Sequence, residues 1–159
     1  MKIRIGIASQ TLHFIENGEE KIYRVSTSKY GAGERKGSLR TPRGLHVIRA
    51  KIGEGLPINT VFVGRRPTGE IYSKELAERF PERDWILTRI LWLCGKTPGF
   101  NRFGEVDTMS RYIYIHGTPD KSEMGEPGSI GCIRMRNADL VELFGRFASG
   151  TQVEILEHS

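Results

Sequence analysis

The chain of 159 residues has the length of a single domain, and its 38% hydrophobic and 27% charged residues are typical of a globular protein. The 19 glycines favour a turn-rich, mostly β architecture over a helical bundle. The net charge of +5 favours an anionic partner. Because the basic residues are scattered, with neither long runs of Lys and Arg nor aromatic residues between them, we expect no nucleic-acid partner.

The two cysteines, Cys94 and Cys132, could form at most one disulfide bond. The chain has no CxxC pair of the kind that builds structural zinc sites. We therefore expect free thiols, and neither a metal ion nor a cofactor.

The first residues of the chain predict a strand. Ile3, Ile5 and Ile7 alternate with polar or small residues over residues 2–8, which is the period of a strand with one buried face. This alternation differs from the continuous apolar core of a signal peptide, and no segment has the ~20 apolar residues of a membrane span. The sequence as printed therefore shows no export signal and predicts no membrane span.

A β-hairpin is predicted next, because Asn17 and Gly18 tolerate the positive φ of a tight turn and separate two apolar stretches. The residues of these stretches are Leu12, Phe14, Ile22, Tyr23 and Val25. A loop over residues 26–39 and the turn Thr41-Pro42-Arg43-Gly44 then lead into a short strand over residues 45–48.

Residues 51–84 are the least regular part of the sequence, since three prolines interrupt any long element. Ser73 is a candidate N-cap for a short helix that ends at Arg79. An excursion of this length is often functional.

Two further strands are predicted. Residues 85–93 alternate like a strand, although their length would also suit a helix, and we predict a strand. After a loop over residues 95–107, residues 111–115 predict a strand with Tyr112, Tyr114 and His116 on one face. His116 would then lie at the end of that strand, exposed by the turn that follows it.

The C-terminal part predicts a helix and a closing strand. Asn137 can cap a helix over residues 138–148 that ends before Gly150. Its core-facing residues would be Leu140, Val141 and Phe144. Val153 and Ile155 indicate the last strand, and the whole chain, 1–159, is expected to form a single domain.

Cys132 is the leading candidate for a nucleophile. Arg134 and Arg136 follow it and a helix is predicted shortly after, so we expect a lowered thiol pKa that favours the thiolate. Gly131 would allow a tight backbone turn, with N–H groups facing a developing oxyanion. The alternative is a buried cysteine in a glycine-containing turn, because single cysteines are often small core residues.

His116 is the leading candidate for the base. A strand would hold its imidazole rigidly, whereas His13, His46 and His158 lie in less suggestive surroundings. A histidine at a strand end is, by itself, more often structural than catalytic. The sequence thus indicates one histidine partner for one cysteine.

Residues 115–118 read IHGT and residues 129–135 read SIGCIRM. Together they resemble the signature of the YkuD-like L,D-transpeptidases, which has the form HGT, a spacer and S-x-G-C-x-R. The turn at residues 41–44 resembles the TPxG turn of that family, and the opening hairpin fits its first strands. The resemblance therefore spans nearly the whole chain, and it implies a YkuD-like β-sandwich or mixed sheet with minor helix, including a C-terminal helix near the nucleophile loop.

The resemblance also implies a reaction on bacterial cell-wall peptides. Cys132 would attack the carbonyl between the third, diamino acid residue of a peptidoglycan stem and a terminal D-alanine, forming a thioester. His116 would deprotonate the amine of a second stem, which gives a 3,3 cross-link. Backbone N–H groups at Gly131 and Cys132 would contribute to the oxyanion hole, with Ser129 and Gly117 as supporting residues.

Several roles stay open. Many family members have histidine where this chain has Ile130, so a backbone carbonyl near Gly117 or Ser129 is expected to orient the His116 ring. Arg134 could hold a substrate carboxylate or brace the loop. Tyr112 and Tyr114 could line the substrate cleft, although ordinary strand aromatics are the favoured interpretation. Residues 51–84 would correspond to a variable lid.

Alternative functions follow from the same residues. Water as the acceptor would make the protein an L,D-carboxypeptidase. A site without catalytic activity would make it a peptidoglycan-binding module. Metal binding by His46, His116, Cys94 and Cys132 is disfavoured, because the spacing fits no zinc pattern and a metal would block attack. We expect a monomer that acts in the periplasm or at the cell wall, while the missing signal leaves the cytoplasm open.

Overall fold

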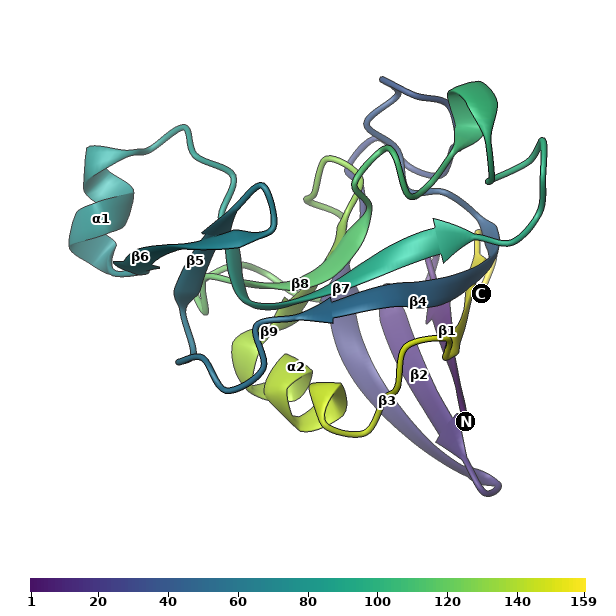
Figure 1. The fold of residues 1–159 in the computed structure, drawn as a ribbon, viewed down its shortest axis with the longest axis horizontal. Helices are drawn as coiled ribbons and strands as arrows, with labels where there is room; N and C mark the ends of the chain where they lie inside the picture. The colour runs from purple at the N-terminus through teal and green to yellow at the C-terminus, as the bar shows by residue number, and fades with distance from the viewer.

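The computed structural model describes residues 1–159, and its regular secondary structure is mainly strand (Figure 1). The elements are β1 (Lys2–Gly6), β2 (Thr11–Glu16), β3 (Glu19–Ser26), β4 (Gly44–Ile52), β5 (Thr60–Val63), β6 (Arg66–Ile71), α1 (Lys74–Arg79), β7 (Ile86–Gly95), the 3-10 helix Gly104–Val106, β8 (Tyr114–Thr118), β9 (Ile133–Arg136), α2 (Asn137–Phe144) and β10 (Gln152–Leu156). Neither α1 nor α2 has the length and apolar content that a bilayer crossing requires.

The strands form one mixed sheet that closes on itself. Their order is β4-β10-β1-β2-β3-β9-β8-β7, and β4 also pairs with β7, so these strands make a complete circuit. The pairs β1–β10 and β8–β9 are parallel, and the other pairs are antiparallel. The hairpin β5–β6 is attached to β7 and, with α1, projects from the closed sheet as a separate lobe (Figure 1). The prediction of a mostly β fold with a mixed sheet and minor helix is confirmed.

The core lies inside the closed sheet and under α2. Alternating strand residues such as Ile3, Ile5, Leu91 and Ile133 are buried there in one cluster. Helix α2 lies against β7, β8 and β9 and adds Leu140, Leu143 and Phe144, and Phe147 from the segment after the helix joins the same cluster. The three helical residues follow the i, i+3, i+4 spacing of one helix face, so Leu143 is buried where we predicted Val141.

Local signals in the sequence predicted several elements well. The turn between β2 and β3 has positive φ at Asn17 (51°) and Gly18 (78°), which is the type I′ hairpin expected there. The Ser73 side chain accepts a 3.1 Å hydrogen bond from the Leu76 N–H and caps α1. The predicted strand over residues 85–93 is β7, with a bulge at Thr88, whose φ is 76°.

Residues 51–84 are more regular than we predicted. They contain β5, β6 and α1 between short turns. The expectation of an irregular segment failed because Pro67 lies in β6, which is the edge strand of the sheet, and an edge strand tolerates a residue without an N–H.

The predicted strand over residues 111–115 was misplaced. Tyr112 lies in a turn, with φ of 58° and its N–H bonded to the Met109 carbonyl at 3.0 Å, and β8 begins only at Tyr114. His116 is therefore in the middle of a strand and is 1% exposed, rather than exposed at a strand end. The reason is the pairing of β8 with β9, which extends the strand through Gly117 and Thr118.

Helix α2 is shorter than predicted. It begins at Asn137 with Arg136 as its N-cap residue, and it ends at Phe144, before Gly145. No side chain caps its first turn, and Asn137, the predicted cap, is instead the buried first residue of the helix.

Candidate active site

The parallel pairing of β8 and β9 brings the two candidate residues to one face of the sheet. His116 is in register with Arg134, and Ile115 with Ile133. Cys132 directly precedes β9 and therefore lies beside Tyr114, whose N–H is 3.4 Å from the Cys132 Sγ. Because paired residues on neighbouring strands point to the same side, Cys132 and His116 are diagonal neighbours on the face opposite the core.

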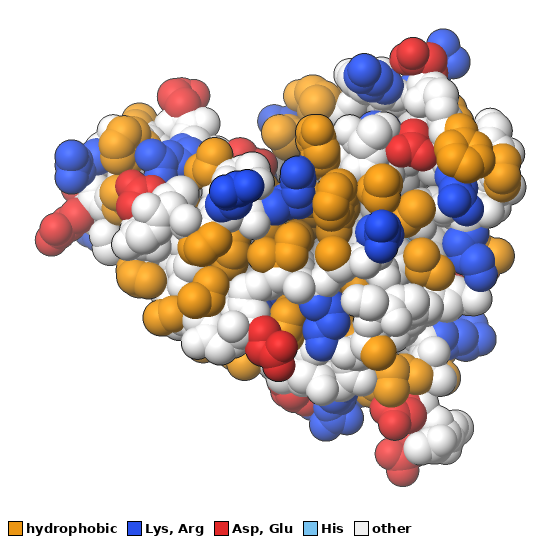
Figure 2. Space-filling model, viewed as in Figure 1, with side chains coloured by type: hydrophobic (Ala, Val, Ile, Leu, Met, Phe, Trp, Pro, Cys, Tyr) orange, Lys and Arg blue, Asp and Glu red, His pale blue; other side chains and the backbone are white.

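Cys132 lines a groove of about 560 Å³. It is half-buried, packs against the cluster of Phe62, Ile90 and Tyr114, and donates to the Tyr112 carbonyl at 3.4 Å. The groove walls include Leu39, Arg65, Asp84, Ile86 and Ile130. Figure 2 shows this side of the molecule hollowed between the projecting lobe and the closed sheet, with hydrophobic and basic side chains around the hollow.

The pKa of the Cys132 thiol is raised, whereas we predicted that it would be lowered. Burial raises this pKa to about 12, and the Tyr114 N–H and the guanidinium groups of Arg134 and Arg111 offset only part of the effect. The expected helix start is also too distant to help, because the whole of β9 separates Cys132 from α2. Burial therefore favours the neutral thiol over the thiolate.

The His116 ring is oriented by a backbone carbonyl, as expected. Its Nδ1 lies 2.6 Å from the Gly117 oxygen. Because a carbonyl can only accept, Nδ1 carries the proton and Nε2 is left with a lone pair. Burial lowers the pKa of His116, so the imidazole is neutral near neutral pH.

Gly117 is required by a close approach of neighbouring groups. A Cβ at this position would lie 2.2 Å from the Asn137 Oδ1 and 2.6 Å from the Leu87 carbonyl oxygen. Both distances are far below van der Waals contact. The glycine therefore lets the His116 strand pack directly against β7 and α2.

The loop before the nucleophile is closed by its own hydrogen bonds. Gly131 has φ of 132°, a conformation that favours glycine. The Ser129 hydroxyl donates to the Cys132 carbonyl at 2.6 Å and accepts from the Gly131 N–H at 3.2 Å. Thr41, from the predicted turn, donates to the Gly131 carbonyl at 3.0 Å. The Gly131 N–H is thus engaged, whereas the Cys132 N–H takes part in none of the turn and loop bonds.

Arg134 braces the site in this structure. Its guanidinium donates to the Gly128 carbonyl at 3.1 Å and forms an ion pair with Asp84 at 3.1 Å. Asp84 was not singled out by the sequence, because it is an isolated carboxylate ahead of β7 with no motif around it. The Asp84 carboxylate also raises the pKa values of both Cys132 and His116 through its negative charge, so it lies close enough to interact with both.

Asn137 connects several segments around the His116 strand. Its Oδ1 accepts from the Thr88 hydroxyl at 2.6 Å, and its Nδ2 donates to the Thr118 carbonyl at 2.9 Å. The side-chain oxygens of Asn59 and Asp120 lie 3.0 and 3.2 Å from the same nitrogen. We had predicted Asn137 as a helix cap, and nothing local in the sequence distinguishes a cap from this buried role.

Replacing Asn137 with alanine should lower the free energy of unfolding by about 1–3 kcal/mol, since buried groups on Thr88 and Thr118 lose their partner. Chemical denaturation checks this value. Ala138→Ser, at the exposed next position of α2, is the control and should stay near wild type. An unchanged midpoint for N137A would contradict the proposed linking role.

The structure places the remaining candidate residues in different surroundings. Tyr114 is buried, Tyr112 is 54% exposed, and both line the groove. Tyr114 belongs to β8, whereas Tyr112 lies in the turn before it. Both cysteines are free, and Cys94 lines a different groove. The His46 ring lies between the Gly44 carbonyl and the Thr108 hydroxyl, and the structure has no group of three or more His, Cys, Asp or Glu side chains able to hold a metal ion.

Comparison with known protein families decides the relationship. The model of the L,D-transpeptidase catalytic domain, YkuD, matches residues 1–155. The chain belongs to this family. The resemblance in the HGT and S-x-G-C-x-R segments is thereby confirmed as a family relationship.

The individual relatives match the chain either over a short segment or at low sequence identity. A Bacillus licheniformis relative named YkuD is 49% identical over 49 residues, which are 30% of either chain. An L,D-transpeptidase structure from Enterococcus faecium has a TM-score of 0.58 at 16% identity, over 98% of this chain and 49% of that one. L,D-transpeptidase 3 from Mycobacterium tuberculosis, in complex with a faropenem-derived adduct, has a TM-score of 0.57 at 15% identity, over 98% and 59%. The chain thus spans 30% of that YkuD relative and about half of these structures, which share its fold.

Proposed function

We propose that the protein is a cysteine-dependent L,D-transpeptidase acting on peptidoglycan stem peptides. The observation that supports this most strongly is the β8–β9 register, which puts Cys132 and His116 on one face of the sheet, with Cys132 lining an open groove. Membership of the L,D-transpeptidase family supports the same reaction class.

The first half-reaction forms a thioester. The Cys132 sulfur attacks the carbonyl between the diamino acid residue and the terminal D-alanine of a donor stem. The thiol proton passes to His116 Nε2, and His116 returns it to the nitrogen of the departing D-alanine. Burial favours the neutral forms of both groups, so in this proposal the thiolate–imidazolium pair forms as the substrate enters.

The second half-reaction releases the product. The amine of a second stem attacks the thioester carbonyl, His116 Nε2 accepts the amine proton, and the Cys132 thiolate leaves and regains that proton. The product is a 3,3 cross-link. A second groove, of about 450 Å³, lies across the Asp84–Arg134 ion pair and is lined by Trp85, Thr118 and Ser122, which gives the acceptor a separate approach.

The backbone stabilises the developing oxyanion in this proposal. The Cys132 N–H is the first donor, and the Gly131 N–H joins it when the Ser129 hydroxyl turns away. Ser129 and Gly117 act as supporting residues, one in the nucleophile loop and one as the hydrogen-bond acceptor that fixes the His116 tautomer. Arg134 supports the loop through Gly128.

Incubation with a tetrapeptide donor should give an acyl adduct on the intact protein, detected by mass, with release of D-alanine. Cys132→Ala should give no adduct, and Cys94→Ala, which changes the other free thiol, should behave like wild type. An undiminished adduct on C132A, or none on wild type, would exclude the mechanism. Adding an amine acceptor should convert the adduct to a cross-linked dimer, whereas hydrolysis alone would identify an L,D-carboxypeptidase.

The proposed substrate places the activity at the cell wall or in the periplasm. Cell fractionation with an epitope-tagged protein checks this. Recovery in the cytoplasm alone would contradict it and would favour a recycled cell-wall fragment as the substrate.

A further inference from the structure

The tip of the β5–β6 hairpin places one arginine in the groove of Cys132. Gly64 and Arg65 form a two-residue turn with φ of 56° and 65°. Positive φ at both positions is the type I′ geometry of a tight hairpin, although an arginine adopts it less readily than glycine. The turn directs Arg65 back toward the closed sheet, where it lines the groove together with Cys132.

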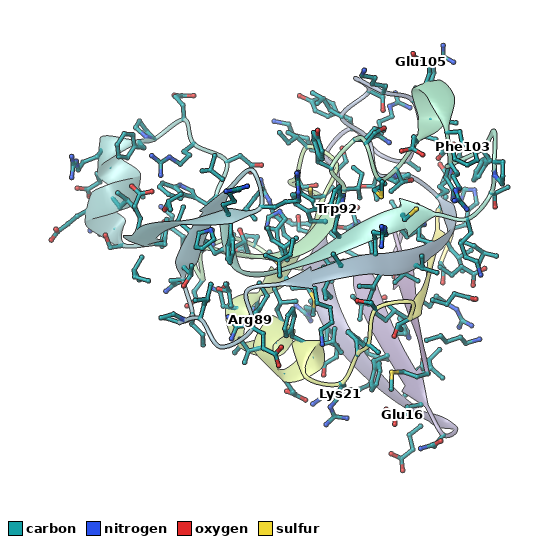
Figure 3. The ribbon with its side chains drawn as sticks, viewed as in Figure 1. Glu16, Lys21, Arg89, Trp92, Phe103 and Glu105 are labelled. Atoms are coloured by element: carbon teal, nitrogen blue, oxygen red, sulfur yellow. The ribbon has the colours of Figure 1, made fainter.

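The Arg65 guanidinium is held by aromatic rings. Its central carbon lies 4.4 Å from the ring centre of Trp92 and 4.9 Å from that of Tyr112. It also donates one 3.1 Å hydrogen bond to the Tyr114 hydroxyl. Figure 3 shows Trp92 in the space between the hairpin and the closed sheet, above β7. Stacking fixes the plane of the guanidinium while leaving its edge available to a ligand.

Among the charged groups of this groove, Arg65 keeps most of its guanidinium N–H donors free of protein partners. The bond to Tyr114 is its only side-chain hydrogen bond. Arg111 uses its guanidinium on the carbonyls of Gly33 and Arg40, and Asp84 is paired with Arg134. Much of the remaining wall is apolar. A planar anion that entered this groove would therefore meet one guanidinium that is already oriented and still has free N–H donors.

The position of Arg65 relative to the thiol suggests which anion it meets. Tyr114 contacts the Cys132 Sγ through its backbone N–H and Arg65 through its hydroxyl. The guanidinium is thus about one tyrosine length from the nucleophile. In a donor that ends one residue after the scissile bond, only the nitrogen and the Cα separate the scissile carbonyl from the terminal carboxylate.

We propose that Arg65 is a specificity-determining residue that binds the C-terminal carboxylate of the acyl donor. The β5–β6 hairpin, which belongs to the lid-like segment 51–84, would then select donors that end in a free carboxylate one residue beyond the scissile bond. The assignment rests on the proposed function.

The test compares two donors that differ only at their end, a tetrapeptide with a free C-terminal carboxylate and its C-terminal amide. Wild type should acylate with the carboxylate donor about 10- to 100-fold more efficiently, in kcat/KM, than with the amide. Arg65→Gln should lose that preference by slowing the carboxylate donor alone, and Arg65→Lys should retain part of it. Arg66→Gln, at the exposed next position of the hairpin, is the matched control and should keep the full preference.

Binding to the C132A variant separates this inference from the proposed function. Tighter binding of the carboxylate donor than of the amide, abolished by adding R65Q, supports the Arg65 assignment even if wild type forms no adduct. Adducts with both donors at equal efficiency would overturn the assignment and leave the transpeptidase proposal intact. An R65Q protein that loses both donors equally would also overturn it, because Arg65 would then only hold the hairpin against Tyr114.

Discussion

His116→Asn should reduce the rate of acylation by about 10²- to 10⁴-fold, which is the usual contribution of a positioned general base. The asparagine amide can still donate to the Gly117 carbonyl in place of Nδ1, but nothing then occupies the position of Nε2. The rate of D-alanine release under single-turnover conditions measures the effect.

His116→Gln is the complementary variant, because its amide reaches toward the Nε2 position but is not basic. Both variants should show this reduction if His116 acts as the base. Wild-type rates for H116N would instead mean that the ring serves only to anchor Gly117, and the proton would need another acceptor. Circular dichroism of the two proteins distinguishes lost chemistry from lost folding.

Cys132 should react with iodoacetamide at least about tenfold more slowly than an ordinary exposed thiol at pH 8 in the absence of substrate. Burial raises the pKa of the thiol to about 12, so the thiolate, which is the reactive form, is a very small fraction below that pH. The rate should rise steadily with pH toward the pKa. The greater intrinsic nucleophilicity of a high-pKa thiolate offsets only part of the loss.

Mass spectrometry on a Cys94→Ala background measures this rate at Cys132 alone. A plateau in the alkylation rate above about pH 7 would contradict the prediction, since it would indicate a resting thiolate–imidazolium pair. The C94A protein should retain the acylation activity of wild type, which shows that the alkylated site is native.

The short-range features of this protein were predictable from the sequence. The alternation of Ile3, Ile5 and Ile7, the Asn17-Gly18 turn and the Ser73 cap each depend on a few neighbouring residues, and all three appear in the structure. The HGT and S-x-G-C-x-R segments led to the right family for the same reason, because each motif is a short local pattern.

Tertiary contacts decided the features that involve distant segments. Residues 111–113 look like strand in isolation, but only pairing with β9 defines where β8 begins, and this buries His116. Asn137 looks like a helix cap until Thr88 and Thr118 are packed around it. Burial of this kind depends on residues far away in the chain.

The sequence by itself determined the family, the mostly β architecture and the pair Cys132 and His116 as candidates. Only the tertiary structure decided the sign of the Cys132 pKa shift, the partner of Arg134 and the entry of Arg65 into the groove. The physical reason is that the cost of removing a charge from water, and the approach of a hairpin tip to a strand about fifty residues later, arise from packing between distant segments.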